Sequence, residues 1–254
     1  MSLYQAAKAC LATSDPLEKA ALTQELAARF FRGELSLEAD DIVEPIKAPG
    51  RPDKPVLVPP KNLPKRGMGT TEGRACFLHA ITHIEFNAMN LAWDAVYRFR
   101  DMPQEFYADF VRVASDESRH FMMLSGRLRE MGMQYGDFEA HNGLWEMAEK
   151  TAHSGLERMA LVPRVLEARG LDVTPGMIVK LRQLGDHATA DILEVILREE
   201  VGHVAAGSRW FRWHCERDGV DPEPTFRRLL VEYGRGVLYG PFNHDARSAA
   251  GFSD

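Results

Sequence analysis

One short motif occurs twice in the chain. Glu117 and His120 form Glu-x-x-His within RVASDESRHFMML, and Glu200 and His203 repeat it within VILREEVGHVAAG. Residues three and four positions apart share a face of a helix, so each pair lies on an apolar stripe. A buried ionised carboxylate is strongly unfavourable unless it forms an ion pair, shifts its pKa or binds a metal. We therefore interpret each pair as metal ligands on a core-facing helix.

A bundle that binds two metals also needs one glutamate from each of the two other helices. Glu85, in THIEFNAMN, meets this need before the first motif, because it lies on an apolar helical face. Before the second motif, Glu167 in VLEARGL has nearly the same spacing to Glu200 as Glu85 has to Glu117. We therefore expect Glu85 and Glu167 to complete the site.

Glu157, in GLERMAL, is the alternative to Glu167. Its helical face is the more polar one, and its spacing to the second motif is longer. The position of Gly170 argues the other way, because a helix that stops there would end only three residues after Glu167. Pro163 is expected to kink this helix and to affect how Glu167 enters the site.

The elements that must position these ligands are expected to be helices, since alternating strand patterns are nearly missing. Two short amphipathic helices are predicted within residues 2–33, split near Pro16. Longer helices are predicted over 70–100, 103–131, 144–168 and 186–216, with a short helix starting at Pro175 and a last one over 224–234. The pattern favours an all-α fold, a four-helix bundle with additional helices at both ends. The long loop between the second and third long helices could return the chain along the bundle, as the crossover of a ferritin-like four-helix bundle does.

Seven prolines lie in the segment from Glu44 to Met68, which excludes a helix or a central strand there. We interpret this segment as an ordered extended strap, with a flexible linker as the alternative. The expected organisation is thus residues 1–69 as N-terminal helices and strap, 70–220 as the bundle, and 221–254 as a C-terminal helix and tail. The stretch HDARSAAGF in that tail either folds over the bundle or is loose.

Composition limits the class of protein. The 254 residues, 45% of them hydrophobic, suffice for a large core, and the net charge of −6 disfavours a broad nucleic-acid surface. The start of the chain does not resemble a secretion signal, and no apolar run is long enough to span a membrane. Cys10, Cys76 and Cys215 form no CxxC pair. These features predict a soluble cytoplasmic protein with reduced thiols and no membrane partner.

The order Glu, Glu-x-x-His, Glu, Glu-x-x-His on four helices resembles the ferritin-like di-iron carboxylate superfamily, which includes rubrerythrins, di-iron hydroxylases and tRNA-modifying hydroxylases. More narrowly, HAITHIEFNAMNLAWDAVYRF, MALVPRVLEARGLDVTPG and ILREEVGHVAAGSRWFRW look like a bacterial ferritin-like family of unknown function. The superfamily resemblance implies two metal ions, iron or alternatively manganese, with the ligands Glu85, Glu117, His120, Glu167, Glu200 and His203.

This resemblance predicts a di-iron oxygenase or oxidase that uses O₂ or peroxide and an external electron donor on an unidentified small molecule or tRNA. The acidic net charge is a mild argument against tRNA. The alternative is an iron-handling or peroxide-removing protein without an organic substrate, like ferritins and rubrerythrins. A structural module with a vestigial site is the third hypothesis. A homodimer remains open, and no catalytic base or nucleophile is evident.

His79 and His83 form a separate His-x-x-x-His pair on the helix that carries Glu85. Their positions point away from the apolar stripe of Glu85. We interpret them as surface or interhelix hydrogen-bonding groups, and a second metal site is the less favoured alternative.

Overall fold

The structure is a computed structural model, and it describes residues 1–38, 42–63, 67–234 and 238–252. Within these ranges the chain is helical, and its only β pairing is two isolated bridges, Ser2–Ser36 and Leu57–Ala140. The prediction of an all-α chain is therefore confirmed for the described residues. The chain divides into two compact units, Met1–Glu146 and Met147–Asp254. None of the described helices is both long enough and apolar enough to cross a bilayer.

Four described α-helices lie wholly in the first unit, and the first three of them begin at side-chain caps that the sequence provides. They are α1 (Leu3–Ala12), α2 (Pro16–Phe31), α3 (Thr71–Arg98) and α4 (Gln104–Glu130). Asp15 Oδ1 accepts the N–H groups of Leu17 and Glu18, and Thr70 Oγ1 accepts that of Gly73. These bonds satisfy amide groups that have no partner within the helix. The predicted starts and ends of α1 to α4 agree with these bounds to within a few residues.

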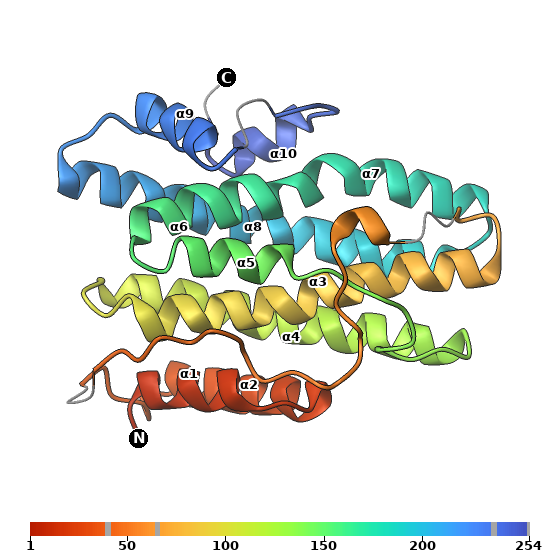
Figure 1. The fold of residues 1–254 in the computed structure, drawn as a ribbon, viewed down its shortest axis with the longest axis horizontal. Helices are drawn as coiled ribbons and strands as arrows, with labels where there is room; N and C mark the ends of the chain where they lie inside the picture. The colour runs from red at the N-terminus through yellow and green to blue at the C-terminus, as the bar shows by residue number, and fades with distance from the viewer. Residues whose placement is uncertain (39–41, 64–66, 235–237, 253–254) are drawn as a thin grey trace. The chain divides into compact units, whose positions relative to one another are not determined.

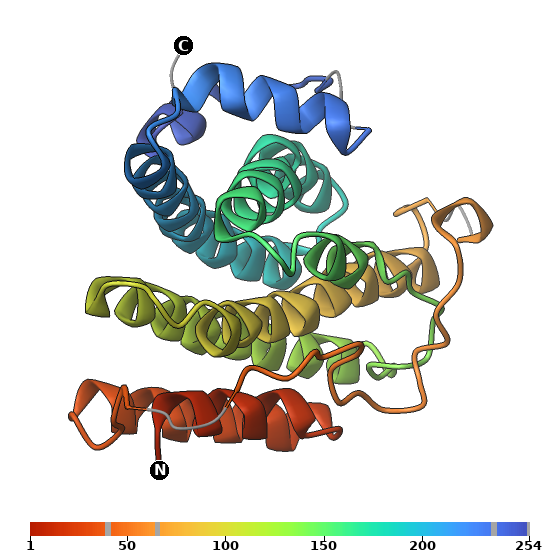
Figure 2. The same cartoon turned by 60° about the vertical axis from the view of Figure 1, so that its left-hand side comes forward.

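In the first unit, α1 and α2 pack alongside the pair formed by α3 and α4 (Figures 1 and 2). Trp93 of α3 is fully buried and donates through Nε1 to Thr23 Oγ1 of α2 at 3.0 Å. The hydroxyls of Tyr4 in α1 and Tyr107 in α4 lie 3.1 Å apart. The N-terminal helices are therefore part of the core that fixes α3 and α4.

The proline-rich strap has defined backbone partners along its described part. The Gly50 N–H donates to Leu11 O at 2.6 Å, and the Val58 N–H donates to Ala140 O at 2.8 Å. The buried Trp145 donates from Nε1 to Lys47 O at 2.9 Å. These contacts match the strap interpretation rather than the flexible linker, although residues 64–66 lie outside the described ranges. A short 3₁₀ turn, η1 (Pro60–Asn62), follows the bridge.

The second unit contains a longer helical run than the sequence led us to expect. Its helical elements are α6 (Gly155–Leu161), the π-helical segment η2 (Val162–Glu167), α7 (Ala168–Gln183), α8 (His187–Asp218), α9 (Pro222–Glu232) and α10 (His244–Ala249). The helix α5 (Gly143–Lys150) spans the division between the units. In this unit α6 and α7 run next to α8 (Figure 2).

The predicted helix over 144–168 starts where expected, but it is interrupted inside this range and does not end at 168. It breaks after Lys150 and restarts with Ser154, whose Oγ caps α6 by accepting the Glu157 N–H at 3.2 Å. It then continues through Gly170 and Pro175 without a stop. Pro175 has no N–H to donate to the carbonyl four residues earlier, but the side-chain amide of Asn243 donates to that oxygen, Leu171 O, at 3.2 Å. A contact from the C-terminal segment therefore helps this helix to tolerate the proline.

The stretch HDARSAAGF forms α10 and packs on the second unit. Arg247 of α10 donates to both carboxylate oxygens of Asp172 in α7, at 2.8 and 2.7 Å. Ala250 is fully buried in a small apolar cluster with Leu171 and Val204. Of the two alternatives for this stretch, the structure shows the folded one.

Candidate metal centre

Three of the expected ligands meet within the first unit. Glu85 of α3 and Glu117 and His120 of α4 each provide a ligand atom, and these atoms lie within 4.8 Å of one another. His120 Nδ1 lies 3.1 Å from Glu85 Oε2 and 3.6 Å from Glu117 Oε2. All three side chains are almost completely buried. Glu85 and Glu117 therefore lie at matching heights on the neighbouring helices α3 and α4.

The electrostatics of this cluster are those of crowded acids around one base. Burial raises the pKa of Glu85 to about 8, and the nearby charge of Glu117 adds to the rise. Burial alone would lower the pKa of His120, but its contacts with Glu117 and Glu85 raise that pKa to about 11. Near pH 7, Glu85 and His120 therefore carry protons at positions where a metal cation would be favourable. A metal that binds here must displace them, so its binding releases protons.

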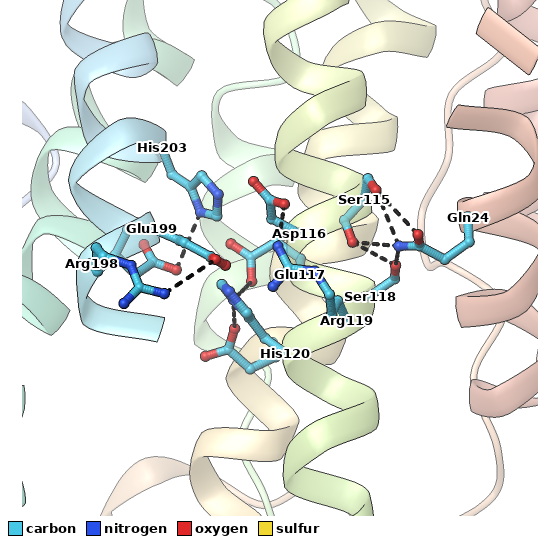
Figure 3. Close-up of polar contacts among 12 residues, drawn as sticks. Gln24, Ser115, Asp116, Glu117, Ser118, Arg119, His120, Arg198, Glu199 and His203 are labelled. Atoms are coloured by element: carbon cyan, nitrogen blue, oxygen red, sulfur yellow. Dashed lines mark hydrogen bonds and ion pairs between the residues drawn. The ribbon is translucent and has the colours of Figure 1, made fainter. Parts of the chain in front are cut away.

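The outer face of α4 is held by α2 (Figure 3). The side-chain amide of Gln24 donates to Ser115 O at 2.6 Å and reaches the hydroxyl of Ser118 at 2.5 Å. Ser118 Oγ also donates to Ser115 O at 2.8 Å. Because Ser118 follows Glu117 directly, these bonds fix the turn of α4 that carries the carboxylate.

The second motif lies on α8 in the second unit. His203 is 4% exposed, and its Nδ1 lies 3.3 Å from Glu200 Oε1. Figure 3 shows the side chain of His203 projecting from α8. In both Glu-x-x-His motifs, the histidine Nδ1 therefore lies close to the carboxylate of the glutamate three residues earlier.

The π-helical segment η2 passes very close to α8 one turn beyond His203. A Cβ atom on Gly207 would lie 2.3 Å from both Cβ and Cγ of Pro163, far inside van der Waals contact. Only glycine fits at this approach. Pro163 therefore alters the helix, as expected, but as a π-helical turn that ends at Glu167 rather than as a simple kink. Such wide turns often occur at functional sites.

The two alternatives for the remaining ligand have different surroundings. Glu157 contacts the Tyr233 hydroxyl through Oε2 and lies 3.2 Å from His153 Nε2. Glu167 lies at the last position of η2, inside a helical run that continues well past Gly170. The objection based on helix length therefore disappears for Glu167. The choice between the two residues remains a prediction.

His79 and His83 are hydrogen-bonded core residues. The Gly136 N–H donates to His79 Nε2 at 2.9 Å, and His83 Nδ1 lies 2.8 Å from the Tyr135 hydroxyl. His83 Nε2 lies 3.1 Å from His141 O. Burial lowers the pKa of both histidines to about 4, so both are neutral near pH 7. Their hydrogen bonds join α3 to the loop that follows α4, which agrees with the predicted hydrogen-bonding role. Both side chains lie in the interior and not on the surface.

The donor set suits a transition metal. Carboxylate oxygens and imidazole nitrogens are ligands of iron, manganese and zinc, and the clustered acids disfavour an arrangement without a cation. Sequence reasoning missed the supports of the site: the Gln24 bonds to α4 and the close approach of Gly207 to Pro163. Only Pro163 gave a signal in the sequence, since a proline inside a helical pattern marks an irregularity.

The fold and the buried side chains define an all-helical protein with a candidate carboxylate and histidine metal centre. The chain belongs to the DUF455 family, described as protein of unknown function, whose family model matches residues 12–254. It is similar to a Haemophilus influenzae protein described as uncharacterized, with 45% identity over 260 residues that cover 98% of this chain and 90% of the relative. No solved structure matches the chain.

Proposed function

We propose that the chain is a ferritin-like di-metal oxidoreductase, with two iron ions, or manganese in their place, as its cofactor. The observation that carries this proposal is the buried cluster of Glu85, Glu117 and His120 in the first unit. The repeated Glu-x-x-His motif on α8 and the continuous helix around Glu167 support it. The full set of six ligands rests on their order in the sequence, which is that of the di-iron carboxylate superfamily.

Bound iron would supply redox chemistry with O₂ or peroxide, which no protein side chain here provides. The residues of the chain would hold and tune it. Carboxylates suit the higher oxidation states of iron because they are hard, negatively charged ligands. Ser115, Ser118 and Gln24 would keep Glu117 in place from behind, as supporting groups do at metal sites.

The proposal includes an external electron donor, because the three cysteines are separate in sequence and none of them forms a disulfide in the structure. An organic substrate, oxidised or hydroxylated at the centre, is the favoured role, and a small molecule is favoured over tRNA. Iron handling or peroxide removal without an organic substrate is the second candidate. It is favoured by the same ligand set, since nothing in that set selects a substrate.

The experiment is to purify the full-length chain without chelator and measure its metal content, and then to titrate the metal-free protein with ferrous iron under anaerobic conditions. About two irons per chain are expected, as in two-metal carboxylate bundles. Admission of O₂ should then oxidise the bound iron faster than free ferrous iron, followed by optical absorption. Glu117→Ala and His203→Ala should each lower the metal content.

Folded protein that binds neither iron nor manganese would overturn the proposal. Full metal content in both variants would show that the ligand assignment is wrong. If bound iron is oxidised and released without any effect of added organic compounds, the iron-handling function is the correct one.

A further inference from the structure

A pocket separate from the candidate ligands opens on the first unit. Its volume is about 380 Å³, within the range of small-molecule sites. Three segments that are distant in sequence form it: the start of α2, the strap, and the end of α4 with the loop after it. The lining residues that bear on its chemistry are Asp15, Lys54, Phe121, Ser125, Arg129, Tyr135 and Asp137.

One polar group in the wall of the pocket is buried and unsatisfied. Ser125 is 6% exposed, and its Oγ has no hydrogen-bond partner among the described residues. A buried hydroxyl without a partner is unfavourable, and a serine in a helix can usually bond a carbonyl of the preceding turn. The position of Ser125 in the lining makes a ligand atom the natural partner for this hydroxyl.

The two cations of the pocket also lack ion-pair partners. Neither Lys54 nor Arg129 forms a salt bridge within the described part of the chain, whereas the nearby Arg127 pairs with Glu130 at 2.8 Å. The two acids of the pocket are already engaged. Asp15 Oδ1 accepts two backbone N–H groups at the start of α2.

The second acid, Asp137, accepts the Gln134 N–H through Oδ2 at 2.8 Å. Backbone donors therefore partly balance both carboxylates, while the charges of Lys54 and Arg129 are not balanced. This asymmetry favours an anionic ligand over a cationic one.

The remaining walls are apolar and well supported. The rings of Phe121 and Tyr135 pack edge to face with centroids 5.3 Å apart. The Tyr135 hydroxyl is held by His83, and the Gly136 N–H by His79. These aromatic walls would receive a flat, apolar group, and the preformed support keeps the cost of ordering the site low.

We propose that this pocket binds a small organic acid, in which an anionic carboxylate or phosphate contacts Lys54, Arg129 and the Ser125 hydroxyl while an apolar or aromatic body lies against Phe121 and Tyr135. The proposal does not depend on the metal centre. Phe121 directly follows His120 in α4, so one helix carries residues of both the pocket and the candidate metal centre.

The test uses ¹⁹F NMR on the full-length chain with a chelator present, so that binding of the probe to metal is excluded. The probes are 4-fluorobenzoate, 4-fluorophenyl phosphate and the neutral 4-fluorobenzyl alcohol. We expect one or both anions to bind at least about tenfold more tightly than the alcohol, because charged hydrogen bonds are lost with the neutral probe. The two anions distinguish a carboxylate site from a phosphate site.

Arg129→Gln and Lys54→Gln should each weaken binding of the preferred anion by about tenfold, and Ser125→Ala by about fivefold, from the lost hydrogen bonds. Arg127→Gln is the matched control: it removes the same charge from the same helix outside the pocket and should leave affinity unchanged. Circular dichroism would confirm that each variant is folded. Binding of the alcohol as tight as that of the anions, equal effects of the Arg127 and Arg129 variants, or no binding of any probe would overturn the proposal.

Discussion

His120 Nδ1 on α4 lies 3.1 Å from Glu85 Oε2 on α3 and 3.6 Å from Glu117 Oε2, so one ring nitrogen faces two buried carboxylates. In the absence of metal, this arrangement crowds two buried carboxylates together, and protons on Glu85 and His120 are needed to balance their charge. It should therefore be unfavourable for folding and favourable for cation binding. The first prediction separates these two effects.

Glu117→Gln keeps the shape of the side chain but removes one of the crowded charges. We expect the metal-free variant to be more stable than the unaltered protein by on the order of 1 kcal/mol. We also expect iron or manganese to raise the Tm of the unaltered protein, and this rise should disappear in the variant. Thermal unfolding with and without metal measures both effects.

Asp116→Asn is the control for this variant. It makes the same charge change at the neighbouring residue, whose partner Arg119 is exposed at the surface of α4. Its stability should change by less than about 0.5 kcal/mol, as for surface ion pairs, with metal binding retained. A less stable metal-free Glu117→Gln protein that still binds metal fully would contradict the explanation.

The glutamate that completes the set in the second unit can be identified by a matched pair of variants. Glu167→Gln should reduce iron from about two to about one per chain, because each metal of a two-metal carboxylate site depends on its own terminal ligands. Glu157→Gln should leave the metal content unchanged and affect only the contacts with Tyr233 and His153. The reverse pattern would assign the ligand to Glu157. Metal analysis of both purified variants gives the answer.

The close approach of Pro163 to Gly207 predicts a steric effect. Gly207→Ala places a methyl group 2.3 Å from two ring carbons, and relief requires movement of η2 or α8. We expect a loss of about 1–3 kcal/mol in the free energy of unfolding, as for other overpacked sites. Urea unfolding of the metal-free protein measures this loss.

Gly202→Ala on the same helix is the matched control, because nothing lies within 4 Å of its added Cβ. It should stabilise α8 by up to about 1 kcal/mol through helix propensity alone. If both variants change stability in the same direction and by the same amount, the contact between Pro163 and Gly207 has no energetic role.

Lys19 predicts a pH dependence of stability. Its side chain is fully buried, its Nζ donates to Gly50 O at 2.8 Å and contacts Asn90 Oδ1, and burial lowers its pKa from 10.5 to about 7. The unfolded chain keeps the higher value, so it holds more protons between pH 7 and 10.5. The contribution of Lys19 to the free energy of unfolding should thus increase with pH in this window, by up to about 1.4 kcal/mol per pH unit.

Urea unfolding at pH 7, 8 and 9 tests this dependence. Lys19→Met should reduce the slope with pH, whereas Lys180→Met, at an exposed position of α7, should not. Equal slopes in the unaltered protein and in Lys19→Met would mean that the lysine stays charged in the folded state.

Much of the fold was readable from the sequence, because apolar periodicity and capping residues such as Asp15 and Thr70 are local signals. The Glu-x-x-His pairs were likewise visible from spacing alone. The continuous helix around Glu167 could not be predicted from local signals. Its continuation past Pro175 is supported by a hydrogen bond from Asn243, a residue distant in sequence. The same limit applies to Ser125 and Lys54, whose shared pocket exists only after the strap and the loop after α4 come together.

The backbone bonds between the strap and Ala140 have a consequence for synthesis of the protein on the ribosome. Val58 donates to Ala140 O, and Ala140 donates to Val56 O at 3.1 Å, so these partners emerge only after α3 and α4 have been translated. Until then this part of the strap has only water to bond. A nascent chain that ends before Ala140 should therefore show α1 and α2 without protection of the Val58 amide from hydrogen exchange, and chains extended beyond α5 should gain it.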